Sequence, residues 1–146
     1  PEIILAGRRL NDNMPSYIAK RFIKLMLNND INILKAKILV LGLTFKENCP
    51  DTRNSKVFDM IESLCSYKCN VDVYDPNVNK RYITSKLHGR LISFPETQKY
   101  DGIILAVKHD IFLEKGIINL RKYGKKNHVF FDLKYAFAES ESDDQL

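Results

Sequence analysis

Short apolar runs alternate with amphipathic stretches along most of this chain. Five of the runs have the length and the β-branched or aromatic content of strands, namely Lys37–Leu41, Val71–Tyr74, Arg90–Ile92, Ile103–Val107 and Val129–Asp132. The stretches between them predict helices at Lys56–Tyr67, Val78–Lys86 and Ile111–Tyr123, and a short turn near Glu96–Lys99. Alternating strands and helices form right-handed crossovers and a parallel sheet that is buried on both sides. The pattern therefore predicts an α/β fold, a Rossmann-like open parallel sheet with strand order 3-2-1-4-5 and helices on both faces.

The two ends of the chain do not follow this alternation. Residues 1–33 look like an apolar arm and part of a linker or dimerisation helix, with Asp12 or Asn13 as its N-cap and Pro15 in its first turn. The apolar stripe of this helix suits core packing and a dimer or interdomain surface equally well; it consists of Ile18, Phe22, Leu25 and Met26. An arm without a local partner indicates a fragment of a longer protein. Residues 34–137 form the sheet domain, and we expect the acidic tail 138–146 to be disordered.

The loop from Gly42 to Ser55 (GLTFKENCPDTRNS) carries the most chemistry in the chain. It follows the first predicted strand, and ligands of open α/β sheets bind at the carboxyl ends of the strands. Lys46 and Arg53 place two cations near a helix N-terminus, which suits a phosphate. Phe45 beside Lys46 could stack on a ring and neutralise an anion. A loop Phe that fills a core gap, next to a solvated Lys, explains this pair equally well.

A self-contained dinucleotide site should have a G-x-G-x-x-G turn directly after the first strand. Only Gly42 is present there, so a single-domain NAD enzyme is disfavoured. Asp75 ends the second strand where a ribose-binding carboxylate would lie, but a turn role before Pro76 is favoured. A receiver domain is disfavoured because its phosphoacceptor Asp is missing after the third strand. His109, beside Asp110, is interpreted as a cap or surface residue in preference to a general base.

Composition narrows the classes of function. The chain has 146 residues, 45% hydrophobic and 28% charged, which suits one globular domain. Without a membrane-length apolar run or a signal-peptide pattern, we expect a cytoplasmic protein with no membrane partner. The net charge of +5 is dispersed, so we expect no nucleic-acid partner. The three cysteines, Cys49, Cys65 and Cys69, are predicted to be reduced thiols without a metal site.

At this point the residues match a known family. The run GLTFKENCPDTRNS, the later VYDP (Val73–Pro76) and the opening AGRRLNDNMPSYIAKR (Ala6–Arg21) resemble the C-terminal, UDP-binding domain of the UDP-glucose/GDP-mannose dehydrogenase family. The residues of these motifs are most similar to those of members that oxidise UDP-N-acetylhexosamines for surface polysaccharides. The resemblance implies NAD-dependent oxidation of a C6 hydroxyl to a carboxylate, through a thiohemiacetal and a thioester on a cysteine. That cysteine motif and the NAD-binding glycine motif are absent, so we expect no activity from this chain alone.

The resemblance also implies roles for individual residues. Phe45 and Lys46 match a pair that contacts the substrate, and Lys46 would assist catalysis. Arg53 matches an arginine that reaches towards NAD on the other domain, and Lys134 falls near a position that contacts the substrate. Asp51 and Asn54 would be loop and helix-cap residues.

The same resemblance implies the partners of the chain. They would be a UDP-sugar, the N-terminal NAD-binding domain of the same polypeptide, and a second copy in a homodimer formed through the central helix. Cys49 would not be the nucleophile. A non-catalytic nucleotide-binding or interaction module with the same sheet is the alternative.

Overall fold

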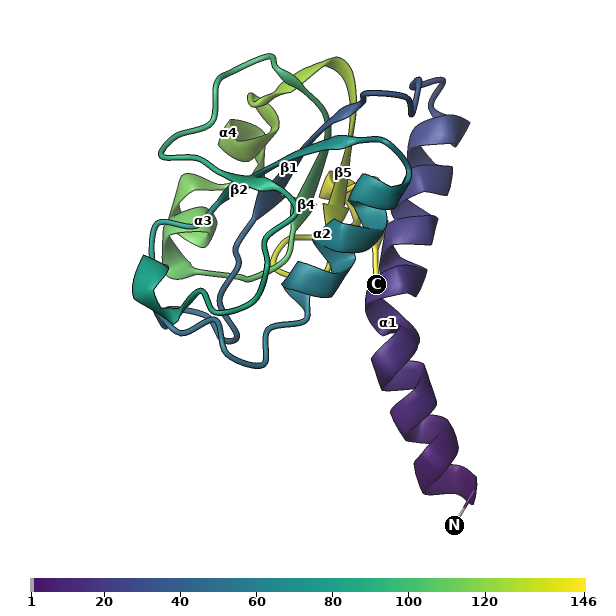
Figure 1. The fold of residues 1–146 in the computed structure, drawn as a ribbon. Helices are drawn as coiled ribbons and strands as arrows, with labels where there is room; N and C mark the ends of the chain where they lie inside the picture. Colours follow the sequence, from purple (N-terminus) through teal and green to yellow (C-terminus); the bar gives the residue numbers. More distant parts are fainter. Residues whose placement is uncertain (1) are drawn as a thin grey trace.

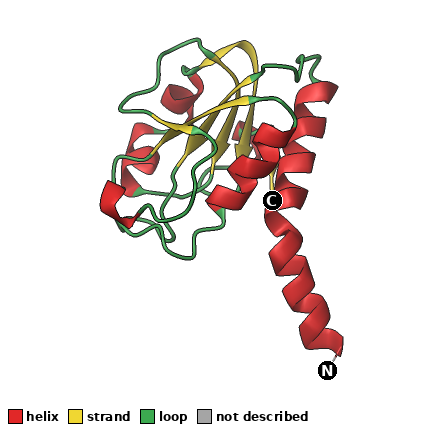
Figure 2. Cartoon of the chain, viewed as in Figure 1, coloured by secondary structure: helices red, strands yellow, loops and turns green. Residues whose placement is uncertain are grey.

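A six-stranded parallel sheet forms the centre of the protein, with helices packed on both of its faces (Figure 1). The computed structural model describes the backbone of residues 2–146 and the side chains of residues 13–146. Figure 2 shows the helices and strands in the same view. In chain order they are α1 (Glu2–Asn28), β1 (Lys37–Leu41), α2 (Val57–Ser66), β2 (Asn70–Tyr74), β3 (Arg90–Leu91), β4 (Tyr100–Leu105), α3 (Asp110–Lys115), α4 (Ile117–Arg121), β5 (Gly124–Asp132) and β6 (Asp144–Gln145).

The sheet has the strand order β3-β2-β1-β4-β5-β6. All of its strand pairs are parallel, and Val40 of β1 lies beside Val73 of β2 and Ile104 of β4. This confirms the predicted α/β, Rossmann-like fold and the order of its first five strands. The sixth strand, β6, comes from the acidic tail. The expectation that this tail is disordered was therefore wrong.

Successive residues of β1 are buried on opposite faces of the sheet. Ile38 and Val40 belong to a core cluster with α1 and α2, whereas Leu39 and Leu41 pack in a second cluster with α3 and α4. All four side chains are fully buried. Because helices cover both faces, no polar residue alternates with the apolar ones after the exposed first residue, Lys37, and the rest of β1 is a continuous apolar run.

Helix α1 begins earlier than the sequence predicts. It starts at Glu2 and includes Pro15 in its interior, so the prediction of an arm up to Asn13 and an N-cap at Asp12 or Asn13 was wrong. The side chains of that arm lie outside the described residues. The second half of α1 packs on the sheet, where the Phe22 ring lies so close to Gly102 that a Cβ there would approach it to 2.4 Å. The first half extends away from the sheet (Figure 1).

Two other predicted helices differ from the structure. Instead of a helix at 78–86, only a short 3-10 turn forms at Lys80–Tyr82, capped by the Asn79 side chain, which accepts a hydrogen bond from the Arg81 N–H. Polar side chains such as Asn favour such local bonds over a continued helix. The predicted helix at 111–123 is divided into α3 and α4 by Gly116, whose φ is +79°. Among the described residues, no helix is both long enough and apolar enough to cross a bilayer.

The glycine after β1 is required by a close approach of two strand ends. Gly42 has a φ of +98°, and a Cβ built on it would lie 2.5 Å from the Cβ of Val107. We therefore expect Gly42→Ala to lower the free energy of unfolding by about 1–3 kcal/mol from overpacking, in addition to backbone strain. Urea unfolding measures the loss. Gly116→Ala is the matched control, because Gly116 also has a positive φ but no atom within 4 Å of its Cβ position. Equal losses in the two variants would contradict the role of the contact with Val107.

Candidate functional site

A cavity of about 410 Å³ opens at the carboxyl edge of the sheet, on the side that α1 and α2 cover. Its walls come from the residues that follow β1, β4 and β5 and from the first turn of α2. Helix α1 and Leu146 complete the lining. The lining residues are Met14, Pro15, Ile18, Thr44, Phe45, Asn54, Ser55, Lys56, Val57, Met60, Ala106, Val107, Leu133, Lys134 and Leu146. Ligands of open parallel sheets bind at this edge.

One part of the cavity lining is cationic and another part is apolar. Lys56 and Lys134 supply cations, and they lie beside the N-terminus of α2, which attracts anions through its backbone N–H groups. The wall formed by α1 and its neighbours is apolar, with Ile18 and Met60 buried beneath it. Such a site suits a ligand that joins a phosphate to a flat or apolar group.

The structure brings two of the four predicted site residues into this cavity. Phe45 and Lys134 both line it, although they are far apart in the sequence. Lys46 is exposed next to it, with its Nζ 5.9 Å from the centre of the Phe45 ring. The Phe45 side chain is 51% exposed. The alternative in which Phe45 fills a core gap is therefore wrong.

Arg53 lies outside the described lining of the cavity. Its guanidinium donates to both carboxylate oxygens of Asp51, from Nη2 to Oδ2 at 2.6 Å and from Nε to Oδ1 at 3.1 Å, and lies over the Tyr82 ring. These hydrogen bonds lower the pKa of the Asp51 carboxyl. Asp51 is a loop residue, as expected. Asn54 is not a helix cap: Lys56 holds the N-cap position of α2.

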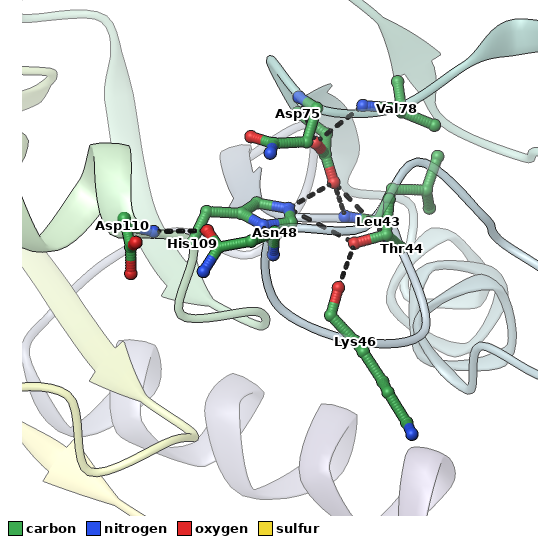
Figure 3. A network of polar contacts seen from close by, with 9 residues as sticks. Leu43, Thr44, Lys46, Asn48, Asp75, Val78, His109 and Asp110 are labelled. Carbon is green, nitrogen blue, oxygen red and sulfur yellow. Dashed lines mark hydrogen bonds and ion pairs between the residues drawn. The ribbon is translucent and has the colours of Figure 1, made fainter.

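A buried network joins the loop after β1 to two neighbouring strands (Figure 3). The Asp75 carboxylate, at the end of β2, accepts hydrogen bonds from the backbone N–H groups of Leu43 and Thr44, at 2.7 and 3.2 Å. His109, at the start of α3, contacts the same carboxylate oxygen through its Nε2 at 2.9 Å. The side chains of Asp75 and His109 are both fully buried. Asp75 also accepts bonds from two N–H groups after Pro76, which confirms its predicted turn role.

The partners of His109 define the tautomer of its ring. The backbone N–H of Asn48 donates to Nδ1 at 2.8 Å, so Nδ1 carries no proton. Nε2 must therefore carry the ring proton and donate it to Asp75, with the Thr44 hydroxyl 3.3 Å away. A doubly protonated ring would lose the bond from Asn48. His109 is thus a buried positioning group that holds the N-cap position of α3, so its interpretation as a cap residue is confirmed in position and its interpretation as a surface residue was wrong.

The charge of Asp75 is stabilised despite its burial. Burial raises the pKa of this carboxyl, but hydrogen bonds from His109 and the Leu43 N–H outweigh burial and hold the pKa below its usual value of 3.8. The carboxylate is therefore ionised at neutral pH. Asp75 follows β2 and His109 follows β4 of the same parallel sheet. This placement was a signal in the sequence that the two side chains could meet.

The cysteines lie away from this network. Cys49, Cys65 and Cys69 are free thiols, and burial raises the pKa of Cys69 to about 11. Among the described side chains, no group of three or more His, Cys, Asp or Glu residues could hold a metal ion.

The parallel sheet, the cavity at its carboxyl edge and the cations beside a helix N-terminus define a Rossmann-like nucleotide-binding domain. Comparison with known proteins narrows this class. Residues 39–139 match the model of the UDP binding domain of the UDP-glucose/GDP-mannose dehydrogenase family. The chain belongs to this family, and the resemblance seen in the sequence is confirmed.

Relatives align with the whole chain. It is 48% identical over 146 residues to UDP-N-acetyl-D-glucosamine 6-dehydrogenase from Pseudomonas aeruginosa, and 44% identical to the enzyme of that name from Salmonella typhi. All of this chain aligns, with 35% and 34% of those proteins. The chain therefore spans about a third of the length of these relatives.

Solved structures support the same assignment. UDP-D-ManNAc dehydrogenase from Pyrococcus horikoshii superposes on 92% of this chain with a TM-score of 0.74 and 26% identity, over 30% of its own chain. NDP-N-acetyl-D-galactosaminuronic acid dehydrogenase from Methanosarcina mazei Go1 gives a TM-score of 0.78 at 19% identity. It covers 94% of this chain and 28% of its own. At that identity the likeness shows the fold.

We expect Asp75→Asn to destabilise the protein by about 1–3 kcal/mol, the cost of leaving a buried hydrogen-bond donor without its acceptor. The two oxygens of Asp75 accept bonds on opposite sides, from the loop and His109 and from the turn after Pro76. An amide must direct its NH₂ group at one of these sets of donors. Urea unfolding at neutral pH measures the loss, and Asp110→Asn, at an exposed neighbour of His109, is the control.

The pH dependence of the same unfolding measurements identifies the cause. Because the pKa of Asp75 is lowered in the folded state, its contribution is present above the unfolded value near 3.8 and is lost as the pH falls through the folded value. The wild-type free energy of unfolding should therefore decrease in this acid range more steeply than that of Asp75→Asn. Parallel acid profiles would show that the Asp75 charge contributes nothing.

Proposed function

We propose that this chain is the nucleotide-sugar-binding domain of an NAD-dependent UDP-sugar 6-dehydrogenase, which oxidises the C6 hydroxyl of a UDP-N-acetylhexosamine to a carboxylate for surface polysaccharide synthesis. The observation that carries the proposal is the cavity in which Phe45 and Lys134 meet beside the N-terminus of α2. The names of the relatives from P. aeruginosa and S. typhi support the choice of substrate.

The two characters of the cavity fit the two parts of such a substrate. Lys56, Lys134 and the N-terminus of α2 would oppose the diphosphate. The exposed Phe45 ring and the apolar wall would hold the flat face of the uracil or the sugar. Lys46 has no ion-pair partner among the described side chains, so its ammonium can meet an oxygen of the substrate that becomes negative during oxidation.

NAD would accept the hydride from the substrate. The residues of this chain do not form the tight glycine turn that holds a dinucleotide, because Gly42 is followed by a long loop before α2 begins at Val57. We therefore assign NAD mainly to the N-terminal domain of the same polypeptide. Arg53 would reach towards it after exchanging its contact with Asp51. The three free cysteines suit the reducing cytoplasm, and we expect the full-length enzyme to be a homodimer.

Binding of UDP to this chain tests the site directly. We expect UDP to bind in a calorimetric titration, and Lys134→Ala to weaken its affinity by about tenfold, the scale for losing one charge-assisted contact. Lys126→Ala is the control, because Lys126 is exposed and lies outside the described lining. NAD should bind this chain weakly. Tight NAD binding, or no UDP binding, would contradict the proposal.

Turnover of the full-length enzyme tests Lys46. We expect Lys46→Ala to reduce kcat by 10-fold or more, because a donor that stabilises negative charge in the transition state is lost. The assay follows NADH formation with a panel of UDP-hexoses and UDP-N-acetylhexosamines. Lys108→Ala, at an exposed position outside the cavity lining, should retain the wild-type rate. Near wild-type kinetics in Lys46→Ala would exclude its assisting role.

A further inference from the structure

The segment of residues 138–146, which we call the closing segment, is attached to the edge of the sheet. Its strand β6 pairs with β5, with Asp144 beside Phe131 and Gln145 beside Asp132. Asp143 adds a bond of 2.7 Å from the Phe130 N–H to its carboxylate. This attachment explains why a segment of acidic and polar residues is ordered.

A second set of contacts ties the closing segment to α1. Arg21 binds both carboxylate oxygens of Asp144 at 2.7 Å and donates to the Gln145 carbonyl at 2.8 Å. The ion pair is partly buried, with side-chain exposures of 34% and 23%. A planar guanidinium that makes parallel bonds to one carboxylate fixes both distance and orientation. We call the Arg21–Asp144 pair the clamp. It holds the closing segment at one position along α1, and residue 146 lies beside that helix (Figure 1).

The clamp places Leu146 in the wall of the cavity. Leu146 is partly buried against the core cluster that contains Ile18, and both residues line the cavity. Gln145 also donates to the Asp132 carboxylate at 3.2 Å, and Asp132 in turn accepts a bond from the backbone N–H of Lys134 at 3.1 Å. The closing segment thus contacts both an apolar wall of the cavity and the loop that carries Lys134.

These walls lie outside the part of the chain that matches the family model. The match covers residues 39–139. Ile18 and its neighbours in α1 precede it and Leu146 follows it, and the Arg21–Asp144 clamp joins the two outlying elements to each other.

We propose that the clamped closing segment is a fixed wall of the nucleotide-sugar site and that Leu146 is a positioning residue for the bound ligand. This inference rests on the proposed function, since it names residues of the same site. Arg21 and Asp144 act through Leu146, and they hold the wall against α1. Loss of the clamp lowers the fraction of molecules whose wall is in place, and the apparent affinity falls by the same fraction.

Calorimetric titration of the 146-residue chain with UDP tests the wall. Leu146→Ala should weaken UDP binding by about tenfold, the scale for removing apolar groups from a pocket. Asp144→Asn should weaken it by about fivefold, as expected if the wall is in place in one molecule out of five. The direction is diagnostic, because removal of a negative charge near an anionic ligand would tighten binding if charge alone acted. Tighter or unchanged binding by Asp144→Asn would overturn the proposal.

A double-mutant cycle separates the clamp from a general loss of structure. Once Arg21→Ala has opened the clamp, adding Asp144→Asn should change the UDP affinity little, whereas independent effects would add. Glu139→Gln, an exposed acidic position on the same segment, should bind UDP as the wild type does. Thermal unfolding confirms that each variant is folded at the titration temperature. If the wild-type chain binds no UDP, the proposed function fails; if it binds and the cycle is additive, the wall alone is rejected.

Discussion

The loop after β1 depends on one buried contact, between the Asp75 carboxylate and the His109 imidazole. The loop has no helix or strand of its own, and these two side chains bind three of its backbone N–H groups, those of Leu43, Thr44 and Asn48. Burying a carboxylate costs several kcal/mol unless hydrogen bonds compensate for it. Here the donors come from three parts of the sheet edge, namely the loop after β1, the turn after β2 and His109. Phe45 and Lys46 lie between the anchored residues, so they project from a backbone whose position is fixed.

The elements that the sequence predicted well are those whose signal is local. β1 was predicted to the residue, because burial on both faces makes it a continuous apolar run. The order of the first five strands followed from the alternation of strands and helices. In the site, the loop after β1 was predicted from its place behind a strand. The family resemblance assigned Phe45 and Lys134 to the substrate, and both residues line the cavity. The contacts of all four residues, Phe45, Lys46, Arg53 and Lys134, with a ligand stay predictions.

The elements that the sequence missed depend on partners far along the chain. The closing segment is polar enough to suggest disorder, yet Asp144 meets Arg21, 123 residues away. His109 was interpreted as a cap or surface residue, yet it is fully buried and bonded to Asp75, 34 residues earlier. Contacts of this kind leave no periodic pattern in the sequence. The early start of α1 has another cause. Proline usually lies in the first turn of a helix, but Pro15 lies in the interior of α1.

Different parts of the cavity would provide the affinity for nucleotide sugars and the discrimination between them. The cations and the α2 N-terminus lie within the part of the chain that matches the family, and they would meet the diphosphate that all nucleotide sugars share. Contacts common to every ligand cannot distinguish one from another, because specificity is a difference between affinities. Discrimination must therefore come from surfaces that meet the remainder of the ligand. In our proposal the apolar wall of α1 and Leu146 is such a surface, and both Ile18 and Leu146 lie outside the part of the chain that matches the family model.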